Sequence, residues 1–374
     1  MVGCGGAGFP THLKLKAGVE YLIVNGAECE PLLRTDRYIM LHHAPQLVKA
    51  ILALKEELSI SRCVIAVKAH YRQEIEALEQ AIGSSPVEIH QLGSFYPAGD
   101  EQTIVHEVTG RVVPPGGLPL AAGAVVDNIA TIYAISQAME GIPFTQKILT
   151  VTGEVAHPVV LSAPVGTSFR ACLELAGGPL THRYCVVSGG PMMGRTLTKE
   201  EAEEAFVTKT TSGILVLPEE RPQGRARAVD LTRMLSRASS ACIQCTSCTQ
   251  LCPRHMPGHP LQPHRIMRKM AMTRDPSTLL QDPDILNARL CCECGVCELY
   301  ASPMGLFPRK INALLKQELA RAGVRRYYSS GDSGNAHRPA AGRRHGGADP
   351  RQHGRPGHPG GRADRDHKGM RYKP

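Results

Sequence analysis

The stretch Cys242-Ile-Gln-Cys-Thr-Ser-Cys-Thr-Gln-Leu-Cys-Pro253 carries four cysteines separated by two, two and three residues, with a proline directly after the last. This C-x2-C-x2-C-x3-C-P spacing is one with which thiolates hold iron–sulfur clusters. Cys242, Cys245, Cys248 and Cys252 are therefore predicted cluster ligands. The pattern favours electron transfer as the function.

A second group, Cys291, Cys294 and Cys297, repeats the C-x2-C-x2-C spacing, but Ser302 and a proline stand where a fourth cysteine and a proline are expected. In two-cluster ferredoxins the fourth cysteine of each run binds the cluster of the other run. We therefore expect Cys252 to complete the second cluster, whereas only Ser302 is left to complete the first. The first cluster would then be a three-iron, a serine-ligated or a labile cluster.

Cys292 is another candidate ligand because it adjoins Cys291. Adjacent side chains diverge, so a buried structural thiol is the favoured interpretation of Cys292. Zinc sites and disulfides are the alternatives for the cysteines as a whole, although zinc usually needs only four ligands in two pairs. Residues 1–10 carry no charge and resemble no secretory signal, so we expect a cytoplasmic protein with reduced thiols.

The composition is that of a protein with packed cores, since 42% of its 374 residues are hydrophobic. This length predicts about two or three domains. A membrane-spanning helix needs about 18 or more uninterrupted apolar residues. The longest apolar stretch, residues 118–135, is broken by Pro119, Asp127 and Asn128, so we expect no direct membrane span.

The formal charge of +9 is unevenly distributed along the chain. Residues 331–374 hold ten Lys/Arg and four Asp/Glu, which accounts for +6 of the total. That segment contains no Leu, Ile, Val, Phe or Cys, so we predict a basic, disordered tail over residues 327–374. Nucleic-acid binding is not expected, because aromatic residues make up only 4% of the chain.

The first 143 residues alternate short apolar strands with helical segments. Residues 21–24 and 63–67 are predicted buried strands, and residues 45–58 between them have apolar side chains at helical spacing. Residues 87–92 add another strand. Strands that alternate with helices predict an α/β domain with an open parallel sheet over residues 1–143.

Beyond residue 143 the pattern changes twice. Residues 144–217 have a strand–turn–strand texture around one helix, which predicts a small β-grasp domain. Residues 218–229 are rich in proline and charge and are predicted to be a linker. Residues 230–326 combine the two cysteine groups with helical apolar spacing, which favours a helical two-cluster domain.

The glycine-rich loop Gly3-Cys-Gly-Gly-Ala-Gly-Phe-Pro10 precedes a predicted helical turn that contains Lys14. Glycine-rich backbone before a helix leaves N–H groups free to bind a phosphate. A dinucleotide fingerprint would follow a strand, and none is predicted before this loop. Taken alone, the loop predicts a tight turn as readily as a phosphate site.

Three further segments make the pattern specific: Asn25-Gly-Ala-Glu-Cys-Glu-Pro31, Tyr96-Pro-Ala-Gly-Asp-Glu101 and Val126-Asp-Asn-Ile-Ala-Thr131. With the loop and the cysteines, they resemble the family of the flavin-bearing subunit of respiratory complex I. The likeness is closer to the RnfC-like proteins of Rnf complexes and to cobalamin reductases of propanediol-utilising microcompartments. It covers residues 1–326, and it implies a Rossmann-like FMN-binding domain, an SLBB-type β-grasp domain and a helical 4Fe-4S dicluster domain.

The resemblance also implies which residues bind a non-covalent FMN and face the nicotinamide donor. They are Gly3, Gly5, Gly6, Lys14, Asn25, Glu28, Glu30, Glu101, Asn128 and Thr131. Amides and hydroxyls suit the flavin ring edge, and carboxylates suit ribose hydroxyls. In the alternative interpretation, Asn25 and Asn128 merely end strands and Glu28 caps a helix. No catalytic side chain is expected, because FMN would carry the chemistry.

The function implied by the resemblance is transfer of electrons from NADH through FMN and two 4Fe-4S clusters to cobalamin. The implied partners are NADH, a corrinoid or a cobalamin adenosyltransferase, and shell proteins of a bacterial microcompartment. One alternative is the RnfC-like component of an Rnf-type electron transport complex. The other is a non-catalytic scaffold that binds a ligand or shell proteins and has degraded clusters.

Overall fold

The computed structural model describes residues 2–4, 8, 10–15, 18–227, 229–273 and 276–324. Gly5 and Gly6 of the predicted cofactor loop lie outside these residues, and so does the predicted tail 327–374. None of the described helices is both long and apolar enough to span a bilayer.

The N-terminal part is built on a four-stranded sheet in which all neighbours are parallel. Its strands, in the spatial order β3-β2-β1-β4, are β1 (Tyr21–Gly26), β2 (Arg62–Lys68), β3 (Val87–Leu92) and β4 (Ala124–Asn128). The central strand β1 buries Leu22, Ile23 and Val24 completely. Such continuous apolar runs occur where both faces of a parallel sheet are covered. The predicted open parallel sheet is confirmed.

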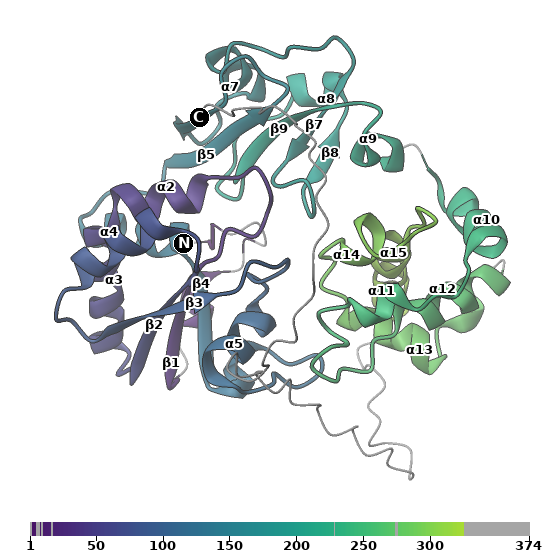
Figure 1. Ribbon diagram of the computed structural model, residues 1–374, viewed down its shortest axis with the longest axis horizontal. Coiled ribbons are helices and arrows are strands. Elements are labelled where there is room, and N and C mark those ends of the chain that lie inside the picture. The colour runs from purple at the N-terminus through teal and green to yellow at the C-terminus, as the bar shows by residue number, and fades with distance from the viewer. Residues whose placement is uncertain are drawn as a thin grey trace, which may run out of the picture. The chain divides into compact units, whose positions relative to one another are not determined.

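Helices cover the two faces of this sheet (Figure 1). Leu22 and Val24 point to one core together with α2 (Thr35–His42), α3 (Ala44–Glu57), α4 (Arg72–Ile82) and α6 (Ile129–Met139). Ile23 points to the other core, which includes α5 (Glu101–Thr109). The short α1 (Thr11–Lys14) and the 3-10 turn η1 (Pro119–Ala122) complete this part. The alternation follows from the two-residue side-chain period of a strand.

The order of the strands has a direct consequence for ligand binding. The chain moves outward from β1 to β2 and β3, and then returns to the other side of β1 with β4. A parallel sheet whose strand order reverses in this way has a crevice at the carboxyl ends of the strands on either side of the reversal. Asn25 and Asn128 are register partners near those ends of β1 and β4.

The second part is a five-stranded mixed sheet with the order β6-β5-β9-β7-β8. Its strands are β5 (Gln146–Gly153), β6 (Val159–Pro164), β7 (Tyr184–Ser188), β8 (Arg195–Leu197) and β9 (Gly213–Pro218). Strands β5 and β9 are parallel, whereas the other neighbours are antiparallel. Helix α7 (Phe169–Leu175) packs Phe169 and Cys172 into the core of this sheet, and α8 (Lys199–Glu203) follows β8. This is the predicted β-grasp arrangement.

The third part is helical, as expected. It contains α10 (Leu231–Ala241), α11 (Ser247–Gln250), α12 (Pro263–Met272), η2 (Pro276–Leu279), α13 (Pro283–Leu286), η3 (Asn287–Leu290), α14 (Val296–Leu299) and α15 (Pro308–Arg321). Between the second and third parts, the predicted linker 218–229 holds a short helix, α9 (Pro222–Arg227), which was not predicted from the sequence. Proline favours the first position of a helix, and Gln223 Nε2 donates to Pro191 O at 3.1 Å.

Candidate functional site

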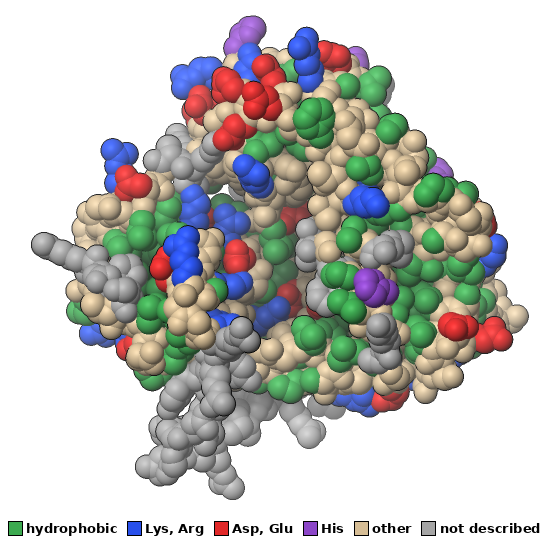
Figure 2. Space-filling view, turned by 180° about the vertical axis from the view of Figure 1, so that it is seen from behind, with side chains coloured by type: hydrophobic (Ala, Val, Ile, Leu, Met, Phe, Trp, Pro, Cys, Tyr) green, Lys and Arg blue, Asp and Glu red, His purple; other side chains and the backbone are tan. Residues whose placement is uncertain are grey.

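A cavity of about 970 Å³ opens at the carboxyl ends of β1 and β4. Its wall combines the parallel-sheet part with the β-grasp segments 188–190, 193–195 and 208–212 and with Arg254, Cys292 and Cys294 of the helical part. Figure 2 shows the surface hollowed among these parts, with acidic and basic side chains in the hollow. The volume lies at the upper end of the range of about 300–1,000 Å³ that is typical of small-molecule sites.

Every predicted cofactor residue that the structure describes lines this cavity. These residues are Gly3, Lys14, Asn25, Glu28, Glu30, Glu101, Asn128 and Thr131. They come from four segments that lie far apart in the sequence, so their meeting at one cavity is a result of the strand order.

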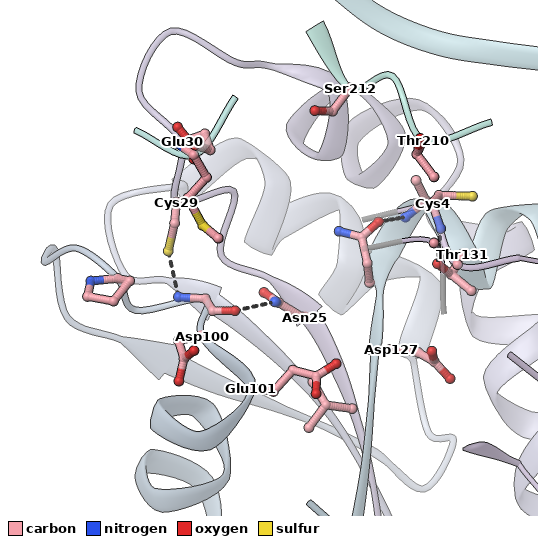
Figure 3. A pocket seen from close by; sticks show the side chains of 18 of the residues that line it. Cys4, Asn25, Cys29, Glu30, Asp100, Glu101, Asp127, Thr131, Thr210 and Ser212 are labelled. Carbon is pink, nitrogen blue, oxygen red and sulfur yellow. Dashed lines mark hydrogen bonds between the residues drawn. The ribbon is translucent and has the colours of Figure 1, made fainter. Parts of the chain in front are cut away.

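The two asparagines are held by local hydrogen bonds. Asn25 Nδ2 donates to Gly99 O at 2.8 Å, and Gly99 N donates to Cys29 Sγ at 2.5 Å (Figure 3). Asn128 Oδ1 accepts from Ala130 N at 2.9 Å and so caps α6, whereas its Nδ2 donates to Asp36 at 2.7 Å. Asn25 and Asn128 therefore bind backbone groups at the ends of their strands, as the alternative interpretation expects. Both residues also line the cavity.

Lys14 and the glycine-rich loop are tied to the same strand ends. Lys14 Nζ donates to Glu101 Oε1 at 2.6 Å and to Val126 O at 3.0 Å. Thr131 Oγ1 accepts from Cys4 N at 2.9 Å, which anchors the loop to α6. Glu101 thus positions the ammonium group of Lys14 beside the cavity.

The two predicted glutamates each accept two backbone N–H groups. Glu28 accepts from Asp36 N at 2.9 Å and Arg37 N at 3.1 Å, which caps the first turn of α2. Burial, together with the neighbouring Asp36 carboxylate, raises the pKa of Glu28 to about 8. This capping contact matches the alternative interpretation of Glu28.

Glu30 reaches from the parallel-sheet part into the β-grasp loop. It accepts from Met192 N at 2.8 Å and Met193 N at 2.9 Å, and burial raises the pKa of its carboxyl group against the effect of these two N–H donors. A Cβ atom at Gly190 would overlap the Glu30 side chain. The glycine in this loop is therefore required by the close approach of Glu30.

Three buried charged residues of the cavity, Asp127, Lys147 and Arg254, were not predicted from the sequence. Asp127 is 3% exposed, its Oδ2 has no hydrogen-bond partner among the described residues, and burial raises its pKa to about 7. Lys147 of β5 is 2% exposed and donates to Cys4 O at 3.3 Å. Asp127 lies inside one of the segments quoted above, so that segment could have identified it. Lys147 offered no signal, because a lysine near the start of a strand normally faces solvent.

A second, small cavity is lined by Cys252, Cys291, Cys292, Cys294 and Cys297. Cys252 therefore lies with the second cysteine group, where the crossed pairing expects it. Burial, reinforced by the neighbouring thiols of Cys292 and Cys291, raises the pKa of Cys252 to about 12. Cys292 and Cys294 line both this cavity and the large one.

The first cysteine group lies closer to solvent. Cys245 is exposed, whereas Cys242 and Cys248 are half-buried. Burial and the nearby thiols of Cys242 and Cys245 raise the pKa of Cys248 to about 11. Ser302 Oγ accepts from Leu306 N at 3.0 Å. Within the described ranges, no three His, Cys, Asp or Glu side chains are grouped as ligands of a single metal ion.

The residues present fit a flavin nucleotide and an iron–sulfur cluster. Lys14 offers a cationic donor for a phosphate, and Gly3 and Gly8 are the described loop glycines that line the cavity with it. Asn25 and Asn128 offer amides for a polar ring edge, and Asp127 offers a buried oxygen that lacks a partner among the described residues. Five thiols around one small cavity include the four that a 4Fe-4S cluster requires.

Three family models match the chain in the order of its structural parts. Residues 1–137 match the Nuo51 FMN-binding domain, residues 148–196 the SLBB domain and residues 241–307 the 4Fe-4S dicluster domain. Together with the two cavities, these matches define the class: the chain is a flavin and iron–sulfur electron-transfer oxidoreductase. The predicted fold class and this function are confirmed.

Similar proteins narrow the class to a family. The cobalamin reductases PduS of Salmonella typhimurium and Citrobacter freundii are 42% and 41% identical to this chain, over 87% and 85% of it and 71% and 69% of their own length. The RnfC-type component of the Na⁺-translocating ferredoxin:NAD⁺ oxidoreductase complex of Acetobacterium woodii is 35% identical over 68% of this chain and 56% of that one. The chain belongs to the family formed by PduS-type cobalamin reductases and these RnfC-type proteins, as the resemblance predicted.

A solved structure with the same fold is the NAD⁺-reducing [NiFe]-hydrogenase in the H2-reduced state. Its TM-score is 0.54 at 21% sequence identity, and the match covers 86% of this chain and 64% of that chain. At this identity the likeness supports the fold alone.

Proposed function

We propose that this protein is an NADH-dependent flavin and iron–sulfur oxidoreductase that reduces a corrinoid. The observation that carries the proposal is the shared wall, defined as Cys292 and Cys294, which line both the large cavity and the cysteine cavity. When bound, FMN accepts a hydride and releases electrons singly, and 4Fe-4S clusters carry them one at a time. A two-electron donor and a one-electron acceptor such as cobalt need this combination.

We assign FMN to the large cavity. Gly3, the neighbouring Gly5 and Gly6, and Lys14 would hold its phosphate and ribityl chain, and Asn25, Asn128 and Thr131 would bind polar atoms along it. Glu101 holds the ammonium group of Lys14 in place. Glu28 and Glu30 face the same cavity, but their carboxylates already accept two N–H groups each, which favours a role in shaping the site.

We assign two clusters to the cysteines. The flavin-side cluster would be bound by Cys252, Cys291, Cys294 and Cys297, which share one cavity, with Cys292 as a spare thiol of that cavity. The outer cluster would be bound by Cys242, Cys245 and Cys248. Because the hydroxyl of Ser302 already accepts the Leu306 N–H, three thiolates and a three-iron or labile cluster are favoured over serine ligation.

These assignments define a direction for the electrons. The flavin-side cluster shares the Cys292 and Cys294 wall with the large cavity, whereas Cys245 of the outer group reaches the surface. Electrons would therefore enter the cysteine-rich part at the flavin-side cluster and leave it at the outer cluster. An exposed exit allows a bulky acceptor to approach.

A corrinoid is the favoured acceptor because the PduS reductases match more of this chain, at higher identity, than the RnfC-type proteins do. The name of the Acetobacterium woodii complex includes NAD⁺, which supports NADH as donor. Following the resemblance, we place the protein in the cytoplasm, inside a bacterial microcompartment, with shell proteins or a cobalamin adenosyltransferase as partners. Copurification with microcompartment shells would test this location.

The test starts from the full chain, purified without oxygen. Flavin, iron and sulfide are quantified, NADH is added, and the flavin and cluster absorbance is followed before and after addition of cob(III)alamin. Bleaching by NADH and subsequent cobalamin reduction without membranes would support the proposal. Bleaching without cobalamin reduction would favour the RnfC-type function, whereas a colourless protein with zinc in its thiol sites would refute electron transfer through these cofactors.

A further inference from the structure

A buried ion pair joins the cysteine-rich part to the parallel-sheet part. Arg254 lies two residues after Cys252, and its side chain is 10% exposed. Its Nη1 and Nη2 donate to Oδ1 and Oδ2 of Asp100 at 2.5 and 2.8 Å, and the Asp100 side chain is 12% exposed. Such a two-fold contact fixes the plane of the guanidinium group as well as its distance.

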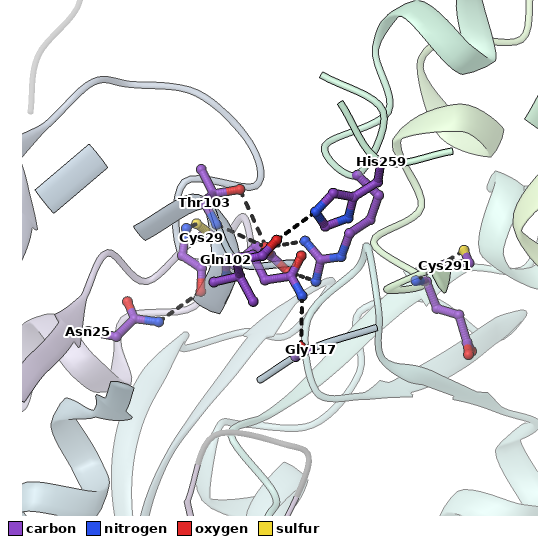
Figure 4. A network of polar contacts seen from close by, with 12 residues as sticks. Asn25, Cys29, Gln102, Thr103, Gly117, His259 and Cys291 are labelled. Carbon is purple, nitrogen blue, oxygen red and sulfur yellow. Dashed lines mark hydrogen bonds and ion pairs between the residues drawn. The ribbon is translucent and has the colours of Figure 1, made fainter. Parts of the chain in front are cut away.

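Asp100 is itself held in place. It is the N-cap of α5, and its Oδ1 accepts from Gln102 N at 3.1 Å and Thr103 N at 3.2 Å. Figure 4 shows Gln102 and Thr103 in this network of polar contacts. The next residue, Glu101, holds Lys14, so the first turn of α5 connects the proposed phosphate site to Arg254.

Two other contacts join the same parts without Arg254. His259 Nε2 donates to Val113 O at 2.8 Å, and Figure 4 shows His259 in the same network. Tyr96 Oη donates to Cys294 O at 2.7 Å. Among the described residues, His259 and Tyr96 share the attachment of the two parts with Arg254, so the Arg254–Asp100 pair is not the sole link between them.

The position of that charge is unusual within its segment. Residues 231–273 contain six Lys/Arg and no Asp/Glu, and Arg254 alone among those six basic residues is buried. It lines the large cavity together with Cys292 and Cys294. An arginine guanidinium is not deprotonated in proteins, and two of its N–H groups here are satisfied by Asp100, so Arg254 carries a positive charge in this buried position.

A fixed cation beside a cluster favours its reduced form. A 4Fe-4S cluster with four thiolate ligands is anionic and gains one more negative charge on reduction. In a medium of low dielectric constant, a nearby positive charge stabilises the more negative state. Exposed arginines exert much less influence, because water and salt screen them.

We propose that Arg254 is a positioning residue that raises the reduction potential of the flavin-side cluster, and that Asp100 holds its guanidinium between that cluster and the flavin cavity. This inference rests on the proposed function, because it requires the cluster to receive electrons from the flavin. It assigns a role to a contact between residues 154 positions apart in the sequence.

The experiment compares the anaerobic full-chain holoprotein with Arg254→Lys, with the double variant Arg254→Gln/Asp100→Asn, and with Arg233→Gln. The double variant keeps a neutral hydrogen-bonded pair, so no charge is left buried alone. Arg233 is a matched control, because it is an exposed arginine on α10 of the same basic segment. Cluster potentials are measured by EPR-monitored redox titration, and thermal unfolding reports on folding.

In the double variant, the electron equilibrium between flavin and flavin-side cluster should shift about tenfold towards the flavin, which equals about 59 mV for a one-electron couple. Arg254→Lys and Arg233→Gln should keep the wild-type potential. An unchanged potential in a folded double variant would overturn the role of Arg254. Wild-type clusters that NADH does not reduce would instead overturn the proposed function and this inference with it.

Discussion

Glu30 joins two domains, and its replacement should destabilise the protein measurably. Its carboxylate accepts from Met192 N at 2.8 Å and Met193 N at 2.9 Å in the β-grasp loop. A hydrogen bond to a charged group contributes about 1.5–3 kcal/mol, so two such bonds contribute about 3–6 kcal/mol. Burial raises the pKa of Glu30, which shows that desolvation opposes its charge, and the lower value of about 3 kcal/mol is therefore expected.

Glu30→Ala should lower the unfolding temperature by about 4 °C, at about 1.3 °C per kcal/mol for a chain of 374 residues with an unfolding entropy of about 2.1 cal/mol/K per residue. Glu30→Gln, which keeps one acceptor oxygen, should show about half of this effect. The assay is differential scanning calorimetry of the anaerobic full chain at pH 8, with flavin content measured on the same samples.

Glu219→Ala is the control, since Glu219 forms an exposed ion pair with Arg183 at 3.1 Å. Exposed pairs contribute about 0–1 kcal/mol, so this variant should melt close to the wild type. The reasoning would be refuted if Glu30→Ala unfolded at the wild-type temperature. Loss of flavin at an unchanged unfolding temperature would instead identify Glu30 as a direct cofactor ligand.

Four further changes test other parts of the structure. Because burial raises the pKa of Asp127 from 3.8 to about 7, the folded state holds that proton more tightly than the unfolded state. The free energy of unfolding of the flavin-free protein should therefore fall by up to about 4 kcal/mol as the pH rises from about 4 to about 7, and Asp127→Asn should remove this fall. Urea unfolding at several pH values measures the free energy. The same pH dependence in the wild type and in Asp127→Asn would contradict the prediction. Cys294→Ser should lose the iron of the flavin-side cluster, whereas Cys292→Ser should keep it; equal iron contents in the two variants would count against the assignment. Ser302→Cys should raise the iron content and change the EPR signal of the outer cluster, so an unchanged spectrum would argue that position 302 supplies no ligand. Gly153→Ala should abolish soluble folding of the β-grasp part, because Gly153 has φ +93° and a Cβ atom there would overlap Val216 O. Circular dichroism measures the folding. A folded variant would show that the strand can shift.

The parallel sheet and the position of Cys252 beside the second cysteine group could be predicted because each depends on a local pattern. The apolar run of β1 indicates burial on both faces, and the spacing after Cys242 indicates a two-cluster ferredoxin, whose known crossing of ligands places Cys252 with the second group. Both predictions use rules that hold in many folds.

The contacts between the parts could not be predicted in the same way. Arg254 and Asp100 lie 154 residues apart, and nothing in either segment specifies the other as a partner. The use of Glu30 as a bridge to Met192 and Met193 depends equally on where the β-grasp loop lies. Lys147 is buried only because its strand packs against the flavin domain.

The shared wall has a consequence for which step limits the rate of turnover. Cys292 and Cys294 line both cavities, and Tyr96 and Asp100 of the parallel-sheet part bind Cys294 and Arg254 of the helical part. With FMN and the flavin-side cluster bound as proposed, electrons would pass between them at this wall without a domain movement. Raising the solvent viscosity with sucrose should leave the rate of internal electron transfer unchanged and slow only the diffusional binding of nucleotide and acceptor.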